Sequence, residues 1–148
     1  MTKKEFEEYL ISIDGLENGY FTDRPPITER YFFSVGDGWL HLIKELIEQA
    51  VKLGWDKQIC QVKEKFGGLR FYINSAPNGV HNLIQKAESA SYSICESCGT
   101  TKNIGQTKGW ISTVCNSCHK KEHPDRIWNI NENKYDTQDN TEFKNLFD

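Results

Sequence analysis

Residues 57–74 read KQICQVKEKFGGLRFYIN, and this stretch decides the fold of the chain. Apolar and polar side chains alternate on both sides of Gly67-Gly68, and this period-two pattern around a glycine pair predicts a β-hairpin. With Gly67 and Gly68 as a two-residue loop, Phe66 opposes Leu69 across the hairpin. One face then carries the residues expected in the core: Cys60, Val62, Glu64, Phe66, Leu69, Phe71 and Ile73.

Helical and strand patterns on either side of the hairpin supply the rest of a small domain. Apolar residues at helical spacing predict helices over residues 3–12, 38–53 and 80–91. Thr2 with Glu5 favours a capping box at the start of the first helix. Asp37 is the expected N-cap of the second helix, and Gly54 is its expected C-terminal cap. Residues 29–35 have the pattern of a further strand. We therefore predict an α+β fold in which a small antiparallel sheet is covered by helices.

Two cysteine pairs, Cys95-Glu-Ser-Cys98 and Cys115-Asn-Ser-Cys118, are separated by residues 99–114. Each C-x-x-C turn can direct two thiolates at one ion, and two such turns complete a tetrahedral Zn²⁺ site with bonds of about 2.3 Å. Four cysteines leave no open position for a substrate, so the expected zinc is structural, with one ion per chain. Two disulfides or unrelated core cysteines are the alternatives.

The residues around these cysteines predict a zinc ribbon appended to the core. Gly105, Gly109 and the β-prone residues 110–114 favour a short hairpin between the two pairs. His119 and His123 follow the second pair at helical spacing, and a polar pair on a short basic helix is a simpler interpretation than competing ligands. The predicted parts are a core domain over 1–92, a zinc-ribbon module over 93–126 and an acidic polar tail over 127–148.

The composition limits the class of protein. Apolar residues make up 37% of the 148 residues, enough for a core, and no run approaches the roughly 18 apolar residues of a membrane span. The opening Met-Thr-Lys-Lys-Glu does not resemble a signal peptide. Five cysteines, four of them in metal-binding spacing, are typical of a reducing compartment, so we expect a cytoplasmic protein. Cys60 is then expected to be a small buried residue.

Charge is unevenly distributed along the chain. The net charge is −3, whereas residues 57–72 carry four basic residues against one acidic residue, a local sum of +3. A protein that follows a long nucleic-acid backbone usually has a broadly basic surface. An acidic protein with one basic patch favours a small anionic ligand or a protein partner.

The outer face of the predicted hairpin is the candidate ligand site. Its expected ligand-binding residues are Lys63, Lys65, Gly67, Gly68, Arg70 and Tyr72. The three cations would neutralise phosphate, the glycine amides would cradle it, and the tyrosine would stack on a base ring. Trp39 or Trp110 could supply a second ring. The alternative is an ordinary solvated strand face.

Catalytic signals are weak. No Ser-His-Asp signature, phosphate-binding loop, dinucleotide fingerprint or HExxH motif occurs. Asp37 and His41 lie one helical turn apart, but capping explains Asp37 more simply. Glu64 lies among apolar neighbours, so it is either paired with a base such as Arg24 or Arg30 or placed in water by a one-residue change of register. We expect no catalytic residues and no enzymatic activity.

Two stretches resemble known families. Residues 114–121, VCNSCHKK, resemble the second zinc knuckle of HNH endonucleases, which carry a catalytic histidine between their knuckles; residues 99–114 contain no histidine. More of the chain, from Gly36-Asp-Gly-Trp39 through KEKFGGLRFY (residues 63–72) to the cysteine pairs, is similar to small uncharacterised proteins of bacteria and their phages. Small phage proteins of this kind often inhibit host defences by binding a protein or sequestering a nucleotide signal, which implies a place in the host cytoplasm.

The resulting hypothesis is a non-enzymatic protein that binds and sequesters a small phosphorylated ligand. A protein-binding inhibitor or adaptor would instead use the acidic surface and the apolar tail residues Phe143, Leu146 and Phe147. A nucleic-acid-binding ribbon would use Lys108, Trp110, Lys120, Lys121 and Arg126. An HNH-like nuclease would need a second, catalytic metal site. A homo-oligomer is compatible with each of these, and no membrane partner is expected.

Overall fold

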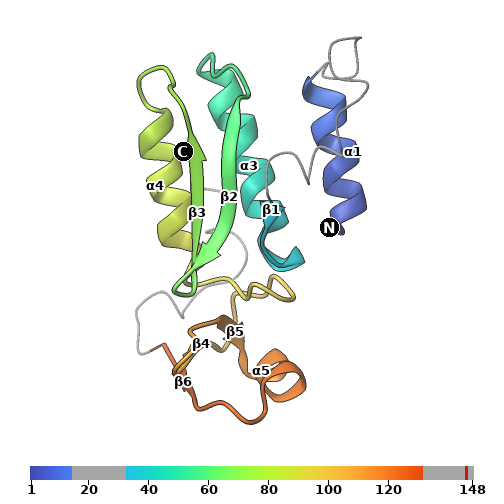
Figure 1. Cartoon of the computed structure of the whole chain (residues 1–148), viewed down its shortest axis with the longest axis vertical. Helices are drawn as coiled ribbons and strands as arrows, with labels where there is room; N and C mark the ends of the chain where they lie inside the picture. Colours follow the sequence, from blue (N-terminus) through green and yellow to red (C-terminus); the bar gives the residue numbers. More distant parts are fainter. Residues whose placement is uncertain (15–32, 132–145, 147–148) are drawn as a thin grey trace.

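The computed structural model describes residues 1–14, 33–131 and 146. Figure 1 shows an α+β core and, below it in this view, a small unit that contains the cysteine pairs. The core contains α1 (Lys3–Asp14), β1 (Phe33–Ser34), the 3₁₀ turn η1 (Asp37–Trp39), α3 (Leu40–Lys52), β2 (Ile59–Lys65), β3 (Gly68–Ile73) and α4 (Val80–Ser91). The second unit contains β4 (Ile104–Thr107), β5 (Thr113–Cys115), α5 (Asn116–Glu122) and β6 (Trp128–Ile130). The predicted α+β class is confirmed.

The three predicted helices are present, with differences at their ends. At the start of α1, the Thr2 hydroxyl accepts the amide proton of Glu5 at 3.2 Å, which is the expected cap. The start of α3 differs from the prediction, because η1 precedes the helix and Trp39 occupies the N-cap position without a side-chain hydrogen bond. Asp37 is therefore not the cap. Gly54 follows the end of α3 with a φ of +93°, the left-handed conformation of a C-terminal glycine cap.

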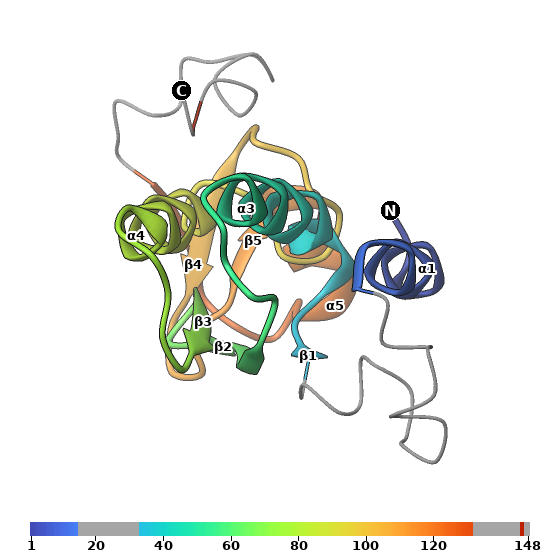
Figure 2. The same ribbon diagram turned by 90° about the horizontal axis from the view of Figure 1, so that it is seen from above.

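The helices form one layer over the core sheet. In Figure 2, α3 and α4 lie side by side over the sheet, and α1 lies beside α3. The core between these layers is made of buried apolar side chains, among them Phe6, Leu10, Trp39, Leu42, Ile43, Leu46, Val62, Leu69, Phe71 and Ala87. Trp39 is fully buried, so it is not available to stack on a ligand. Among the described residues, no helix is long and apolar enough to cross a membrane.

The core sheet has the strand order β1-β2-β3 and is mixed. β2 and β3 are antiparallel, as predicted, whereas β1 runs parallel to β2, with Phe33 opposite Val62. The expectation of a wholly antiparallel sheet is wrong at β1, because η1 and α3 form a crossover that returns the chain in the same direction. Residues 29–32 of the predicted strand lie outside the described residues.

The turn of the core hairpin lies one residue earlier than predicted. Lys65 pairs with Gly68, so Phe66 and Gly67 form the two-residue loop, with φ values of +54° and +81°. Two positive φ values in succession are typical of a type I′ turn, whose first position normally holds Asn, Asp or Gly. A non-glycine residue in this left-handed conformation lowers the stability of the fold by about 1–2 kcal/mol. Gly68 serves close packing instead, since a Cβ there would lie 2.3 Å from the Tyr92 ring.

The shifted turn and an irregular pairing in β2 remove two residues from the predicted core face. Val62, Leu69 and Phe71 face the core as predicted, but Phe66 is 67% exposed because it lies in the loop. Cys60 is exposed as well, because the strand pairing shifts between Ile59 and Gln61, and the expectation of a buried cysteine is wrong. Lys63, Lys65 and Arg70 lie on the opposite face, as the sequence predicts, but Arg70 pairs with Lys63, whereas the predicted register places it opposite Lys65.

The outer edge of β3 is closed by side chains of α4. The amide of Leu69 donates to the Ser91 hydroxyl at 2.9 Å, and the amide of Phe71 donates to a Glu88 carboxylate oxygen at 3.0 Å. Both amides would otherwise lie unpaired at a sheet edge. These bonds attach α4 to the hairpin and orient its C-terminal end toward the second unit.

The second unit is a three-stranded antiparallel sheet of order β5-β4-β6. The short helix α5 lies between β5 and β6 in the chain. The predicted hairpin between the cysteine pairs is confirmed as β4 and β5. β6 pairs with β4 through Gly105 and Ile130, so this sheet continues beyond residue 126, where the predicted module ends.

Candidate metal centre and adjoining groove

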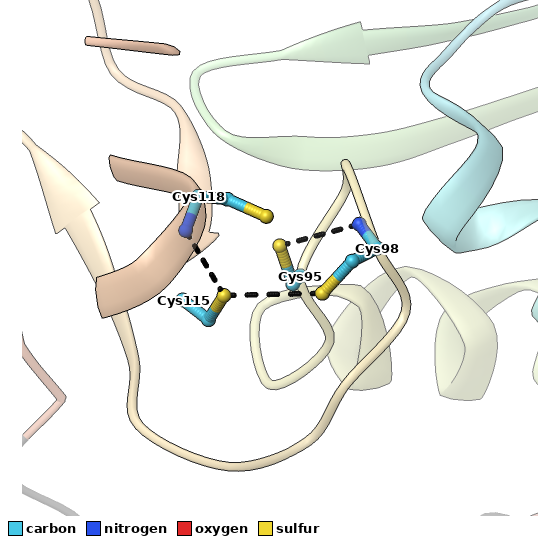
Figure 3. A group of neighbouring side chains, drawn as sticks. All are labelled: Cys95, Cys98, Cys115 and Cys118. Carbon is cyan, nitrogen blue, oxygen red and sulfur yellow. Dashed lines mark hydrogen bonds between the residues drawn. The ribbon is translucent and has the colours of Figure 1, made fainter. Parts of the chain in front are cut away.

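The two cysteine pairs meet in one cluster. Figure 3 shows the side chains of Cys95, Cys98, Cys115 and Cys118 pointing toward a common centre, and their sulfur atoms all lie within 4.8 Å of one another. A tetrahedral ion with Zn–S bonds of about 2.3 Å holds its sulfurs about 3.8 Å apart. The Sγ atoms of Cys98 and Cys115 are 3.8 Å apart, and none of the four is in a disulfide. The cluster therefore fits a structural metal, with zinc as the ion that four thiolates favour.

Each cysteine pair has the local geometry of a zinc knuckle. The amide of Cys98 donates to the Cys95 sulfur at 3.5 Å, and the amide of Cys118 donates to the Cys115 sulfur at 3.4 Å. Such N–H donors stabilise a thiolate, the form in which cysteine binds a metal. The second knuckle also starts α5, because Cys115 is the N-cap of that helix.

Burial and hydrogen bonding act in opposite directions on the thiols. Burial raises the pKa of Cys95 and of Cys118 above the usual range. At Cys115 burial also acts upward, but hydrogen bonds from neighbouring groups, first the Cys118 amide, outweigh it and lower the pKa. Bound Zn²⁺ favours the deprotonated form of every ligand, so metal and protons compete for this cluster.

The neighbouring histidine His119 does not join the ligand set. Its Nε2 atom lies 2.7 Å from the Arg126 carbonyl oxygen, and its ring stacks on Trp128 with centroids 5.8 Å apart. Trp128 in turn donates its indole N–H to the Val114 carbonyl at 2.9 Å. His119 therefore joins α5 to β6 and supports the knuckle from outside.

The first knuckle is attached directly to the start of α3. The amide of Gly38 donates to the Glu96 backbone carbonyl at 2.8 Å, and the amide of Gly36 donates to the Glu96 carboxylate at 3.0 Å. Trp39 donates its indole N–H to the Ile94 carbonyl at 2.9 Å. Burial raises the pKa of Glu96. This contact was missed from the sequence, although two glycines flanking Asp37 before a tryptophan are a signal of close backbone approach.

A second contact joins the tip of the core hairpin to β5. The Thr113 hydroxyl donates to the Gly67 carbonyl, and a Cβ on Gly67 would lie 2.8 Å from Cγ2 of Ile111. The Gly67 amide donates to the Glu64 carboxylate at 3.0 Å. Gly67 and Gly68 are both buried, so they serve the turn and the packing and do not form the predicted anion cradle.

Glu64 stabilises this turn through a hydrogen bond. It is partly buried, and its carboxylate accepts the Gly67 amide proton, which explains a carboxylate on the inner face of the hairpin. Arg24 and Arg30, the partners considered from the sequence, lie outside the described residues.

The cations of the predicted ligand site remain together on the solvent face of the hairpin. The Lys63 ammonium lies 5.7 Å from the centre of the Tyr72 ring, and the Lys65 ammonium lies 5.6 Å from that of Phe66. The Arg70 guanidinium donates to the Leu69 carbonyl at 2.9 Å and to the Tyr92 hydroxyl at 3.3 Å. Of the six predicted ligand residues, the three cations and the tyrosine therefore share one face.

A groove of about 740 Å³ adjoins this face, between the core hairpin tip and the β4–β5 loop. Its lining includes Phe66, Tyr92, Gln106, Lys108, Ile111 and Asn131. Two units contribute to it, and the sequence alone cannot show which residues of separate units meet.

No protein-family model, curated protein or solved structure matches this chain.

Proposed function

We propose that the chain is a non-enzymatic, zinc-stabilised binding protein for a small phosphorylated ligand such as a nucleotide. The observation that supports this most is the solvent face of the core hairpin, where Lys63 and Arg70 are cross-strand partners and Lys65 lies further along β2. Tyr72 lies on the same face and is 41% exposed. Cations beside an aromatic ring on one hairpin suit an anion that is attached to a base.

The cations differ in how firmly they are held. The hydrogen bond to the Tyr92 hydroxyl raises the pKa of Arg70 and holds its guanidinium in place, so this charge is constant and pre-positioned. Lys65 is exposed and Lys63 is partly buried. An exposed ion pair contributes at most about 1 kcal/mol. Binding therefore depends on several contacts that act together.

The metal centre supports a structural role for zinc in this proposal. A site with four protein thiolates has no position left for water or substrate. The ion would hold the two knuckles together, and the first knuckle in turn contacts the start of α3 through the Gly38–Glu96 hydrogen bond. Sequestration of a nucleotide signal, as the resemblance to small phage proteins implies, requires binding and no chemistry.

Isothermal titration calorimetry with ribonucleoside mono- and triphosphates and inorganic triphosphate tests the proposal. The double variant Lys63→Glu/Lys65→Glu should lower the affinity at least about tenfold, because two attractive contacts become repulsive. The matched control Lys120→Glu/Lys121→Glu makes the same charge change on α5, where both lysines are exposed, and should bind like the wild type. Equal losses in both variants would show general electrostatics, and would favour the nucleic-acid-binding ribbon.

A protein-binding inhibitor is the second candidate, and exposed apolar side chains of the second unit favour it. Trp110 is 72% exposed, Ile127 63% and Ile130 45%. Exposed aromatic residues of this kind are frequent anchors in protein interfaces. Among the tail anchors considered from the sequence, Leu146 is partly buried against the core, while Phe143 and Phe147 lie outside the described residues. Loss of partner capture in Trp110→Ala, with nucleotide binding absent from the wild type, would favour this candidate.

A further inference from the structure

The groove between the two hairpin tips has an aromatic residue at its edge whose position is unfavourable for stability. Phe66 has a φ of +54° in the two-residue turn, where asparagine or glycine is preferred. Its ring is 67% exposed, although an aromatic side chain gains most from burial. Strained residues cluster at functional sites, so a strained residue that also exposes its side chain is a candidate for ligand contact.

The groove is built from groups that are already held in place. The Gln106 amide donates to the Tyr92 carbonyl at 3.4 Å and to the Thr113 hydroxyl at 3.2 Å, and the Asn131 amide donates to the same carbonyl at 3.0 Å. Each amide thus directs N–H groups to the protein, and its carbonyl oxygen is the group that can accept from a ligand. The Thr107 hydroxyl donates to the Trp110 carbonyl at 2.7 Å and fixes the β4–β5 loop. A volume of about 740 Å³ is within the range of sites for small ligands.

Positive charge surrounds the groove on both sides. Lys108 lines it from the β4–β5 loop. On the core side the Lys65 ammonium lies 5.6 Å from the centre of the Phe66 ring, and Arg70 is bound to the hydroxyl of the lining residue Tyr92. A simple anion would gain nothing from the Phe66 ring, and an apolar ligand would gain nothing from these cations. A planar ring that carries phosphate uses both.

We propose that this groove is the base-binding half of the ligand site, in which the base of a nucleotide stacks on Phe66 while its phosphates reach Lys65, Arg70 and Lys108. This inference rests on the proposed function and refines it, because it assigns the base to Phe66 at the junction of the two units in place of Tyr72 on the hairpin face. The base would therefore stack on Phe66, a residue whose alternation in the sequence predicts a place in the core.

The variant Phe66→Asn separates binding from folding. Asparagine tolerates the left-handed conformation of this turn, so the melting temperature should stay the same or rise. The loss of one stacking contact should weaken nucleotide binding by about tenfold or more. Binding of inorganic triphosphate should not change, because it has no ring. Phe66→Tyr keeps the ring and is the matched control, which should bind nucleotide like the wild type.

Calorimetry with ribonucleoside triphosphates and inorganic triphosphate distinguishes the outcomes. If Phe66→Asn binds nucleotide as tightly as the wild type, this inference is wrong while the proposed function stands. If the wild type binds neither probe, the proposed function and this inference both fail. If the wild type binds a single-stranded oligonucleotide but no mononucleotide, the occupant is a nucleic acid and the inference is overturned.

Discussion

Replacing Gly38 with alanine tests whether the first zinc knuckle and the core form one folding unit. A Cβ on Gly38 would lie 2.1 Å from the Cys95 carbonyl oxygen and 2.5 Å from the Gly99 amide nitrogen. Both are backbone atoms, so no side chain can rotate away. The closest tolerated Cβ contact is 3.0 Å, so the knuckle and the start of α3 must separate by about 0.9 Å (3.0 − 2.1).

The loss of stability in Gly38→Ala follows from the contacts that this separation disrupts. The Gly38 amide bond to the Glu96 carbonyl (2.8 Å) and the Trp39 indole bond to the Ile94 carbonyl (2.9 Å) both cross the contact. A buried donor left without a partner costs about 1–3 kcal/mol. The two together give about 4 kcal/mol as a middle value, a large part of the 5–15 kcal/mol that typically stabilises a domain. For a chain of this size, we expect a fall in melting temperature of about 8–16 °C.

Urea unfolding followed by tryptophan fluorescence, with zinc content measured on the same samples, provides the test. Asp37→Ala is the neighbouring control, since its side chain is exposed, and it should change the free energy of unfolding by less than about 0.5 kcal/mol. If Gly38→Ala unfolds at the same urea concentration as the wild type and keeps its zinc, the close packing of knuckle and core is refuted.

Three further predictions concern the metal and two buried hydroxyls. Removing the metal with a strong chelator should lower the melting temperature of the whole chain, and calorimetry that shows an unchanged core transition would contradict this. Ser91→Ala should lower the free energy of unfolding by about 1–3 kcal/mol and speed hydrogen exchange at the Leu69 amide, because Ser91 is fully buried and its hydroxyl accepts that amide proton. The exposed control Ser89→Ala should change neither quantity. Tyr9→Phe should leave stability unchanged or raise it by about 1 kcal/mol in urea titrations, since the buried Tyr9 hydroxyl has no hydrogen-bond partner among the described residues. Burial raises the pKa of Tyr9 above its usual 10.0, so the wild type should lose stability relative to this variant above about pH 10, where only the unfolded tyrosine ionises.

Features with a strong local pattern could be predicted from the sequence. α4 runs from Val80 to Ser91, as its apolar spacing indicates, because amphipathic periodicity and the preceding turn define it without reference to the rest of the chain. The cysteine cluster follows from spacing alone, since two C-x-x-C turns suit one tetrahedral ion.

Features that depend on contacts between distant segments were not predictable in this way. The glycine pair predicts a turn formed by both glycines, whereas packing against Tyr92 places Gly68 in the strand. The same one-residue difference puts Phe66 at the edge of the groove. The parallel pairing of β1 depends on the crossover through α3, and the groove depends on the attachment of the second unit. Each requires a tertiary contact that no local pattern encodes.

Native mass spectrometry of protein purified from cells, compared with its denatured mass, tests zinc and nucleotide binding in one experiment. We expect one zinc ion per chain and, after addition of ribonucleotides, a further mass of one nucleotide that is retained by the wild type and lost in Phe66→Asn. A chain that carries no zinc and has its cysteines in disulfides, or one that takes up zinc and no nucleotide at any concentration, would contradict this expectation.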